Sequence, residues 1–149
     1  MAQTTDAMTF EDCKVEISPN GSTWYDASGH SNSVSISGGE RQTGETYTFD
    51  GEFAIVRRGT SEPLEVQCNV EYTEITSDPA DRMLTAYENG SDFWVRWSPG
   101  GGNVGDYMYT TEVGIITSPP YPGGEAGGGD PVVVSLNLKV GKINRTTIT

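Results

Sequence analysis

The chain has 149 residues, the size of one ordinary domain, and its 9 basic and 21 acidic residues give a net charge of −12. This excess of acid opposes binding to nucleic acid or to anionic membrane surfaces. No apolar run approaches the roughly 20 residues of a membrane helix, and the opening residues MAQTTD lack the basic and apolar parts of a secretory signal. We therefore expect one domain over residues 1–149, made in a cytosol, with a flexible segment over 1–10 and a tail over 144–149.

Short runs of alternating apolar and polar residues, separated by Gly, Pro, Asn and Asp, predict a mainly β domain. The expected strands cover residues 14–18, 34–37, 46–50, 53–58, 64–75, 93–97, 107–117 and 132–143. Asp50-Gly51 is a typical signal for a tight hairpin turn, so we expect such a turn between the third and fourth of these strands.

The strand expected over residues 64–75 alternates strictly and is long for a globular protein, in which about five or six residues are usual. One face carries Leu64, Val66, Cys68, Val70 and Tyr72, and the other carries Glu65, Gln67, Asn69, Glu71 and Thr73. The last strand repeats the pattern, with Ser135, Asn137 and Lys139 on its polar side. Such strands belong either to a large sheet or to one that continues beyond the chain. Because Cys68 lies on the apolar side, free thiols at Cys13 and Cys68 are favoured over a disulfide between them.

One segment, SDPADRMLTAYENG over residues 77–90, is typical of a helix of about ten residues. Ser77 or Asp78 can cap it, and Pro79 suits its first turn. Met83, Leu84 and Tyr87 share one face, and the following Asn-Gly pair ends the helix. We expect this helix to pack on a sheet.

Few residues suggest catalysis or ligand binding. His30, the one histidine, lies in a polar stretch without the further ligands that a metal site needs. The Gly-rich stretches over 98–107 and 121–131 lack the Lys-Ser/Thr that follows a phosphate-binding loop. We predict no enzyme activity, no metal and no cofactor. Two alternatives stay open: a carbohydrate-binding or adhesin β-sandwich that uses Trp24, Trp94 and Tyr121, and, with less support, a small hydrolase.

The order of the segments resembles that of a known family. The segments are 15–29, with VEISPNGSTWYDASG; 32–59, with the GGERQTGE loop and the hairpin that follows; 62–74, with EPLEVQCNVEYTE; the helix over 77–90; 93–106, with FWVRWSPGGGNVGD; and 114–143. Together they cover nearly the whole chain and resemble the tail tube proteins, or major tail proteins, of long-tailed bacteriophages.

The resemblance implies a β-sandwich or barrel-like fold with one flanking α-helix. Its subunits form rings of six that stack into a tube, with strands of each copy joining a barrel around the channel. It implies an acidic-lined conduit for DNA in the virion tail, assembled in the cytoplasm of a host bacterium. Partners would be further copies, the tube terminator, the tape measure and the baseplate or distal tail proteins. Genomic DNA would pass through without specific binding.

The alternation of side chains along the strands then identifies candidates for the channel lining. The candidates are Glu65, Gln67, Asn69 and Glu71, joined by Asn137 and Lys139 from the last strand. The resemblance further implies that a loop between early strands reaches the neighbouring ring. By position this loop matches residues 38–45, in which Glu40, Arg41 and Glu45 are candidates for ion pairs between rings.

Overall fold

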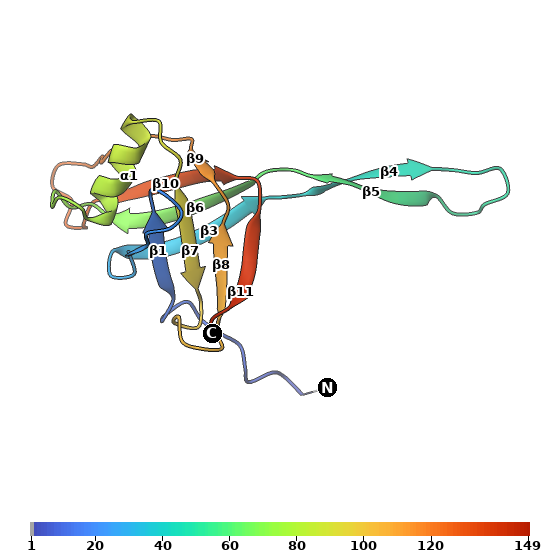
Figure 1. Ribbon diagram of the computed structural model, residues 1–149, viewed down its shortest axis with the longest axis horizontal. Helices are drawn as coiled ribbons and strands as arrows, with labels where there is room; N and C mark the ends of the chain where they lie inside the picture. The colour runs from blue at the N-terminus through green and yellow to red at the C-terminus, as the bar shows by residue number, and fades with distance from the viewer. Residues whose placement is uncertain (1) are drawn as a thin grey trace.

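The computed structural model describes residues 2–149 and forms two antiparallel sheets, one helix and a long hairpin that projects to one side (Figure 1). Sheet A has the strand order β11-β8-β7-β1-β2, and sheet B has the order β3-β6-β10-β9. The projecting hairpin, β4 with β5, is called the arm. The bounds are β1 Lys14–Ser18, β2 Tyr25–Asp26, β3 Ser31–Gly38, β4 Arg41–Thr46, β5 Ile55–Ser61, β6 Leu64–Glu71, α1 Pro79–Glu88, β7 Trp94–Ser98, β8 Tyr107–Thr111, β9 Gly114–Ile116, β10 Val133–Val140 and β11 Ile143–Thr147. The mainly β prediction with one flanking helix is confirmed.

The core lies where the apolar faces of the two sheets meet. Sheet A contributes Val15, Ile17, Val95 and Trp97, while sheet B contributes Val66, Cys68, Val70, Val134, Leu136 and Leu138. These residues are the inward halves of the alternating patterns, so the parity predicted for β6 and β10 is confirmed. Cys13 and Cys68 are free, as expected.

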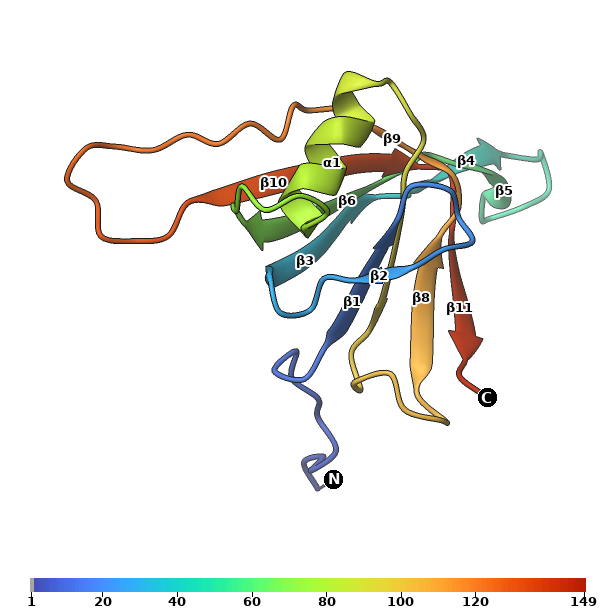
Figure 2. The ribbon, with the colours of Figure 1, turned by 60° about the vertical axis from the view of Figure 1, so that its left-hand side comes forward.

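Helix α1 has the predicted length of ten residues and begins at Pro79. It packs against β6 near the end of that strand (Figure 2). Asp78 occupies the N-cap position, but its carboxylate accepts a hydrogen bond from the Thr73 hydroxyl at 2.6 Å rather than from the helix. At the other end, Gly90 adopts a positive φ, and the N–H of Ser91 reaches the carbonyl of Ala86 at 2.9 Å. This is a glycine stop of the expected kind.

Of the three longest expected strands, 64–75 ends early, at Glu71, and the other two are each divided in the structure. Residues 107–117 form β8 and β9, and residues 132–143 form β10 and the start of β11. Both segments cross between sheet A and sheet B at the same level, where the Glu112 N–H donates to the Lys142 carbonyl at 3.0 Å. The inward positions shift by one residue at each crossing, from Thr111 to Gly114 and from Val140 to Ile143, a change that a bulge within one strand would also produce. Residues 144–147, which were expected to begin a C-terminal tail, lie in β11.

The prediction of a tight turn at Asp50-Gly51 is wrong. The strands of the arm end at Thr46 and restart at Ile55, and residues 47–54 form a wide loop. Gly51 lacks the positive φ that a type I′ turn requires. No part of the core fixes the register here, because every residue of β4 and β5 is exposed.

Leu136 in the centre of β10 provides a test of the core. It is fully buried, so Leu136→Ala should lower the free energy of unfolding by about 2–5 kcal/mol, measured by urea denaturation. Lys139→Ala on the same strand is the control, because an exposed side chain should change stability by no more than about 0.5 kcal/mol. Equal effects of the two substitutions would contradict the assignment of the buried face.

Cys68 provides a second test, because burial raises the pKa of its thiol to about 11. The folded state thus favours the neutral thiol, a contribution that is present below pH 9 and declines as the pH rises toward 11. In a Cys13→Ser variant, the remaining thiol should resist a thiol reagent at pH 8 until the protein is unfolded, since the thiolate is the reactive species. Rapid labelling of the folded variant would contradict the buried position.

Candidate assembly surfaces

The outward side of sheet B is polar, and it is called the polar face. The six residues nominated from parity all lie on it, since Asn137 pairs with Gln67 and Lys139 pairs with Glu65 across β10 and β6. The third strand, β3, adds small hydroxyl side chains at the same levels, with Ser35 beside Gln67 and Ser37 beside Glu65. These side chains are exposed or half-buried, whereas their neighbours in sequence form the core.

A chain of hydrogen bonds crosses the polar face at the level of Asn69. The Asn69 amide donates to the Ser33 hydroxyl at 2.8 Å, and the Ser135 hydroxyl donates to the Asn69 carbonyl oxygen at 2.6 Å. Three neighbouring strands are therefore linked by side chains as well as by backbone bonds, which favours one fixed arrangement of the face.

The charges on the polar face partly cancel. Glu65 and Lys139 stand opposite one another, yet the two ion pairs within residues 2–149 both involve Glu16 instead. Glu71 lies at the end of β6 opposite Val133 and faces no cation on β10. The face is therefore mostly neutral and hydrogen-bonding, with an uncompensated carboxylate at one end.

Sheet B has one open edge within the described chain, at β3, and a second, at β9, that is partly occupied because Gly114 exchanges two backbone hydrogen bonds of 3.0 Å with Phe93. The outer strands are β3, with eight residues, and β9, with three. Apolar side chains accompany them: Ile36 of β3 is 48% exposed although it points toward the core side, and Ile115 of β9 is 64% exposed. Unpaired strand edges with apolar side chains are sites at which another chain adds.

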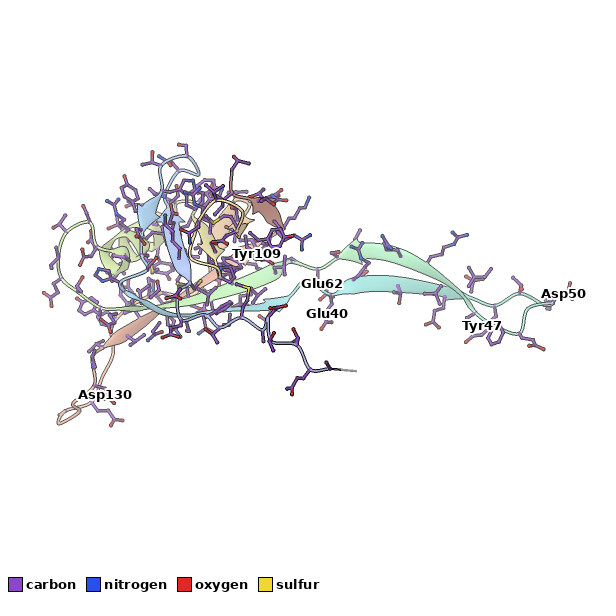
Figure 3. The ribbon with its side chains drawn as sticks, turned by 90° about the horizontal axis from the view of Figure 1, so that it is seen from below. Glu40, Tyr47, Asp50, Glu62, Tyr109 and Asp130 are labelled. Carbon is purple, nitrogen blue, oxygen red and sulfur yellow. The ribbon has the colours of Figure 1, made fainter. Side chains whose placement is uncertain are left out.

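The arm extends β3 and β6 away from the body (Figure 3). At its base, Gly38 and Gly39 adopt positive φ, and the Glu62 N–H donates to the Glu40 carbonyl at 2.8 Å. An added Cβ at Gly38 would lie 2.6 Å from the Pro63 carbonyl oxygen. Glycine is therefore required where the strand pair leaves the sheet.

The three residues nominated for contacts between rings lie at the base and along the arm. Glu40 precedes β4, while Arg41 and Glu45 are in it. The prediction of a loop over residues 38–45 is wrong, because residues 41–46 pair with β5. Sequence reasoning missed the tip, where Tyr47 is 73% exposed and Phe53 is 82% exposed. The alternation over residues 46–50 indicated an ordinary strand. The sequence signal for an exposed tip is the group of three aromatic residues around an acidic turn.

The outer side of sheet A contains a compact ionic cluster. Arg96 of β7 donates to Glu16 of β1 at 2.6 Å, Lys14 lies 3.4 Å from the same carboxyl group, and the Arg96 guanidinium lies over the Trp24 ring. Glu16 is only 7% exposed. Because its charge is compensated on both sides, this cluster serves to join β1 to β7 rather than to bind a ligand.

Little in the structure supports a ligand-binding or catalytic site. Residues 2–149 contain no group of acidic, histidine or cysteine side chains that could hold a metal. The aromatics proposed for sugar stacking make separate contacts, with Trp24 on Arg96, Trp94 beside Gly21 and Tyr121 edge-on to Tyr87. Within the described chain, no helix has the length and apolarity needed to cross a membrane.

No family model and no curated protein sequence matches the chain. Solved structures do match it over nearly its whole length. The tail of an empty gene transfer agent particle, refined with C6 symmetry, matches with a TM-score of 0.69 and 13% identity, covering 95% of this chain and all of that one. The chain has the tail tube fold.

Two further matches come from contractile injection systems. A structure of the sheath/tube terminator of an extracellular contractile injection system has a TM-score of 0.67 and 14% identity, covering 97% of this chain and all of that one. The sheath-tube complex of the same kind of system has a TM-score of 0.64 and 13% identity, covering 97% and 94%. The predicted resemblance is thus confirmed at the level of fold, and the matched structures are parts of tail-like particles.

Proposed function

We propose that the protein is a structural, non-catalytic subunit of a virion tail, which assembles into rings of six that stack into a hollow tube for DNA delivery. The observation that carries this proposal is sheet B, a four-stranded sheet with a buried face, a polar face, an open edge at β3 and a partly open edge at β9. The gene transfer agent tail that it matches was refined with C6 symmetry.

Ring closure follows from the edges of sheet B. If β3 of one copy pairs with β9 of the next beyond the bridge between Gly114 and Phe93, free backbone groups of both edges gain partners and Ile36 is covered. Barrels of about 16–18 strands already enclose an aqueous channel, and six four-stranded sheets exceed that number. The polar face would then line the lumen, with Glu65, Gln67, Asn69, Glu71, Asn137 and Lys139 directed inward.

Such a lining suits the passage of DNA because it offers nothing to hold a phosphate backbone. DNA carries one negative charge per about 1.7 Å of helix axis, so a basic lumen would bind it. Here the hydroxyls and amides are neutral, and Lys139 is offset by Glu65. Passage without specific binding is the expected result.

Stacking of rings is assigned to the arm. A two-stranded ribbon is only marginally stable alone in water, yet this one has every residue of its strands exposed. A neighbouring ring would cover the ribbon and its aromatic tip. Ion pairs of Glu40, Arg41 and Glu45 across that contact would each contribute about 0–1 kcal/mol, repeated in every copy.

Other tail components would meet this tube at its ends. The matched structures include a tube terminator, a tube-terminating cap and a baseplate, so the expected partners are a terminator, a tape measure and baseplate or distal tail proteins. The tail would be assembled in the cytoplasm of a host bacterium. The matched terminators also define a second candidate role, a protein that closes a tube and does not extend it.

Negative-stain microscopy of the purified protein tests the proposal. Concentrated protein should form stacked rings of open-ended length, because the arm can engage a further ring at each step. Replacing residues 47–54 by a short Gly-Ser turn should leave single rings and abolish stacks, as the exposed aromatics are removed. Only monomers at high concentration would contradict the assembly, whereas a single extra ring on a preformed tube would favour the terminator.

Gln67→Lys tests the lumen assignment. Gln67 lies in the middle of the polar face, between Ser35 and Asn137, so the change should not disturb the core. Tubes should form normally, but ejection should be slowed and should recover at higher salt, because each ring would add six cations facing the DNA. Ser22→Lys, on an exposed turn outside sheet B, is the matched control. Normal ejection through the Gln67→Lys tube would contradict the lining and leave the tube assignment intact.

A further inference from the structure

Three of the chain's nine basic residues lie on the arm: Arg41, Arg57 and Arg58. They are exposed, and together with Thr43 and Val56 they line a shallow hollow of about 300 Å³. None of the three forms an ion pair within residues 2–149. Since Glu45 is the one acid in β4 and β5, the arm strands form a basic surface on an acidic protein.

The opposite end of sheet B is acidic. From residue 71 to residue 81 there are four acids and no base, and these four residues, Glu71, Glu74, Asp78 and Asp81, are called the acidic end. Asp78 and Asp81 accept hydrogen bonds from Thr73 and Ser77. Glu71 and Glu74 are exposed and make no side-chain hydrogen bond in the described structure, so their carboxylates are available. Figure 1 shows the arm and α1, which contains Asp81, at opposite ends of sheet B.

We propose that the arginine surface of the arm docks on the acidic end of a second copy, so that both halves of the stacking contact belong to this one chain. The proposal rests on the proposed tube function and names the partner surface of the arm. Guanidinium groups suit this partner because they bind carboxylates through two parallel hydrogen bonds.

The position of the arginines fits an arrangement in which a second copy lies end to end with the first along the direction of the strands. Arg58 precedes Leu64, the first residue of β6, by six positions, which places it about 20 Å beyond the end of sheet B at about 3.3 Å per residue. The loop over 47–54 reaches much farther. An abutting copy would therefore present Glu71 and Glu74 to the arginines, while the aromatic tip would lie farther along that copy.

Such a contact can repeat from one copy to the next along the tube without forming a closed assembly. A head-to-tail interface between different surfaces of identical subunits generates an open filament when no rotation returns it to its start. A chain that carries both surfaces can extend a tube indefinitely, whereas a capping protein needs one of them only. The charge distribution therefore supports tube growth by this chain over the capping role.

Charge reversal on each surface provides the experiment. The arm variant Arg57→Glu/Arg58→Glu and the end variant Glu71→Arg/Glu74→Arg should each form rings, but the mass of pelletable tubes should fall more than about tenfold, which corresponds to 1.4 kcal/mol. An equimolar mixture should recover tubes, because the acidic arm of the first variant meets the basic end of the second, and the converse pair is equally complementary.

Controls separate this contact from other effects. Lys142→Glu/Arg145→Glu changes the net charge by the same amount outside the arm and should leave tube mass unchanged. If the wild type forms no tubes, the proposed function fails. If the wild type forms tubes and neither reversed variant loses them, or if mixing does not restore them, the docking proposal fails alone. A gel shift with duplex DNA that depends on Arg57 and Arg58 would instead assign these residues to nucleic acid and overturn the proposal.

Discussion

The structure depends on one constraint, that backbone donors and acceptors at a strand edge need partners. In sheet A, the edge strands are β2, with two residues, and β11, which passes beside the core. Sheet B presents a longer edge at β3, where eight residues offer free backbone groups and the apolar Ile36 is exposed beside them. In a protein that stays monomeric, the exposed edge of a sheet normally carries charged residues, prolines or bulges that prevent another strand from pairing with it. Here the edge has hydroxyl side chains and a single bulge near its start, which permits orderly addition of a partner strand.

The same constraint explains why the arm is attached to this sheet. The arm prolongs β3 and β6 through a pair of glycines and Pro63, so its orientation is tied to the rigid hydrogen-bonded sheet rather than to a mobile loop. A ribbon anchored in this way loses less conformational entropy on docking than a disordered segment would. In the proposed ring, lateral pairing of sheet B would therefore also align the arms, and the weak ion pairs of each arm would act together.

Local sequence signals predicted the parts of the fold that local physics decides. The range of β1, the helix from Pro79 to its glycine stop and the two faces of β6 follow from periodicity and capping. The six polar-face residues could be grouped because β6 and β10 keep strict alternation in register. By contrast, the crossings at Glu112 and Gly141 leave only a one-residue shift in the inward positions, from Thr111 to Gly114 and from Val140 to Ile143. A bulge within one strand produces the same shift, so the pattern does not show that the chain has changed sheets. The arm was misjudged for another reason: its side chains meet no core, and hydrophobic patterning conveys register only where one face is buried.

Identities of only 13–14% over nearly whole chains show how little of this fold is fixed by particular residues. The inward positions require apolar side chains of suitable volume, and the outward face of sheet B is mostly polar but also admits Val133 and Ile115, so many sequences satisfy both. A contact between copies is different, because both of its surfaces are encoded in one gene and can change together without loss of assembly. Arginines facing carboxylates in one lineage can be replaced by another complementary set elsewhere, provided that each arm still fits its own chain. The surfaces that decide which copies join are therefore the ones that distant relatives of the same fold are least expected to share.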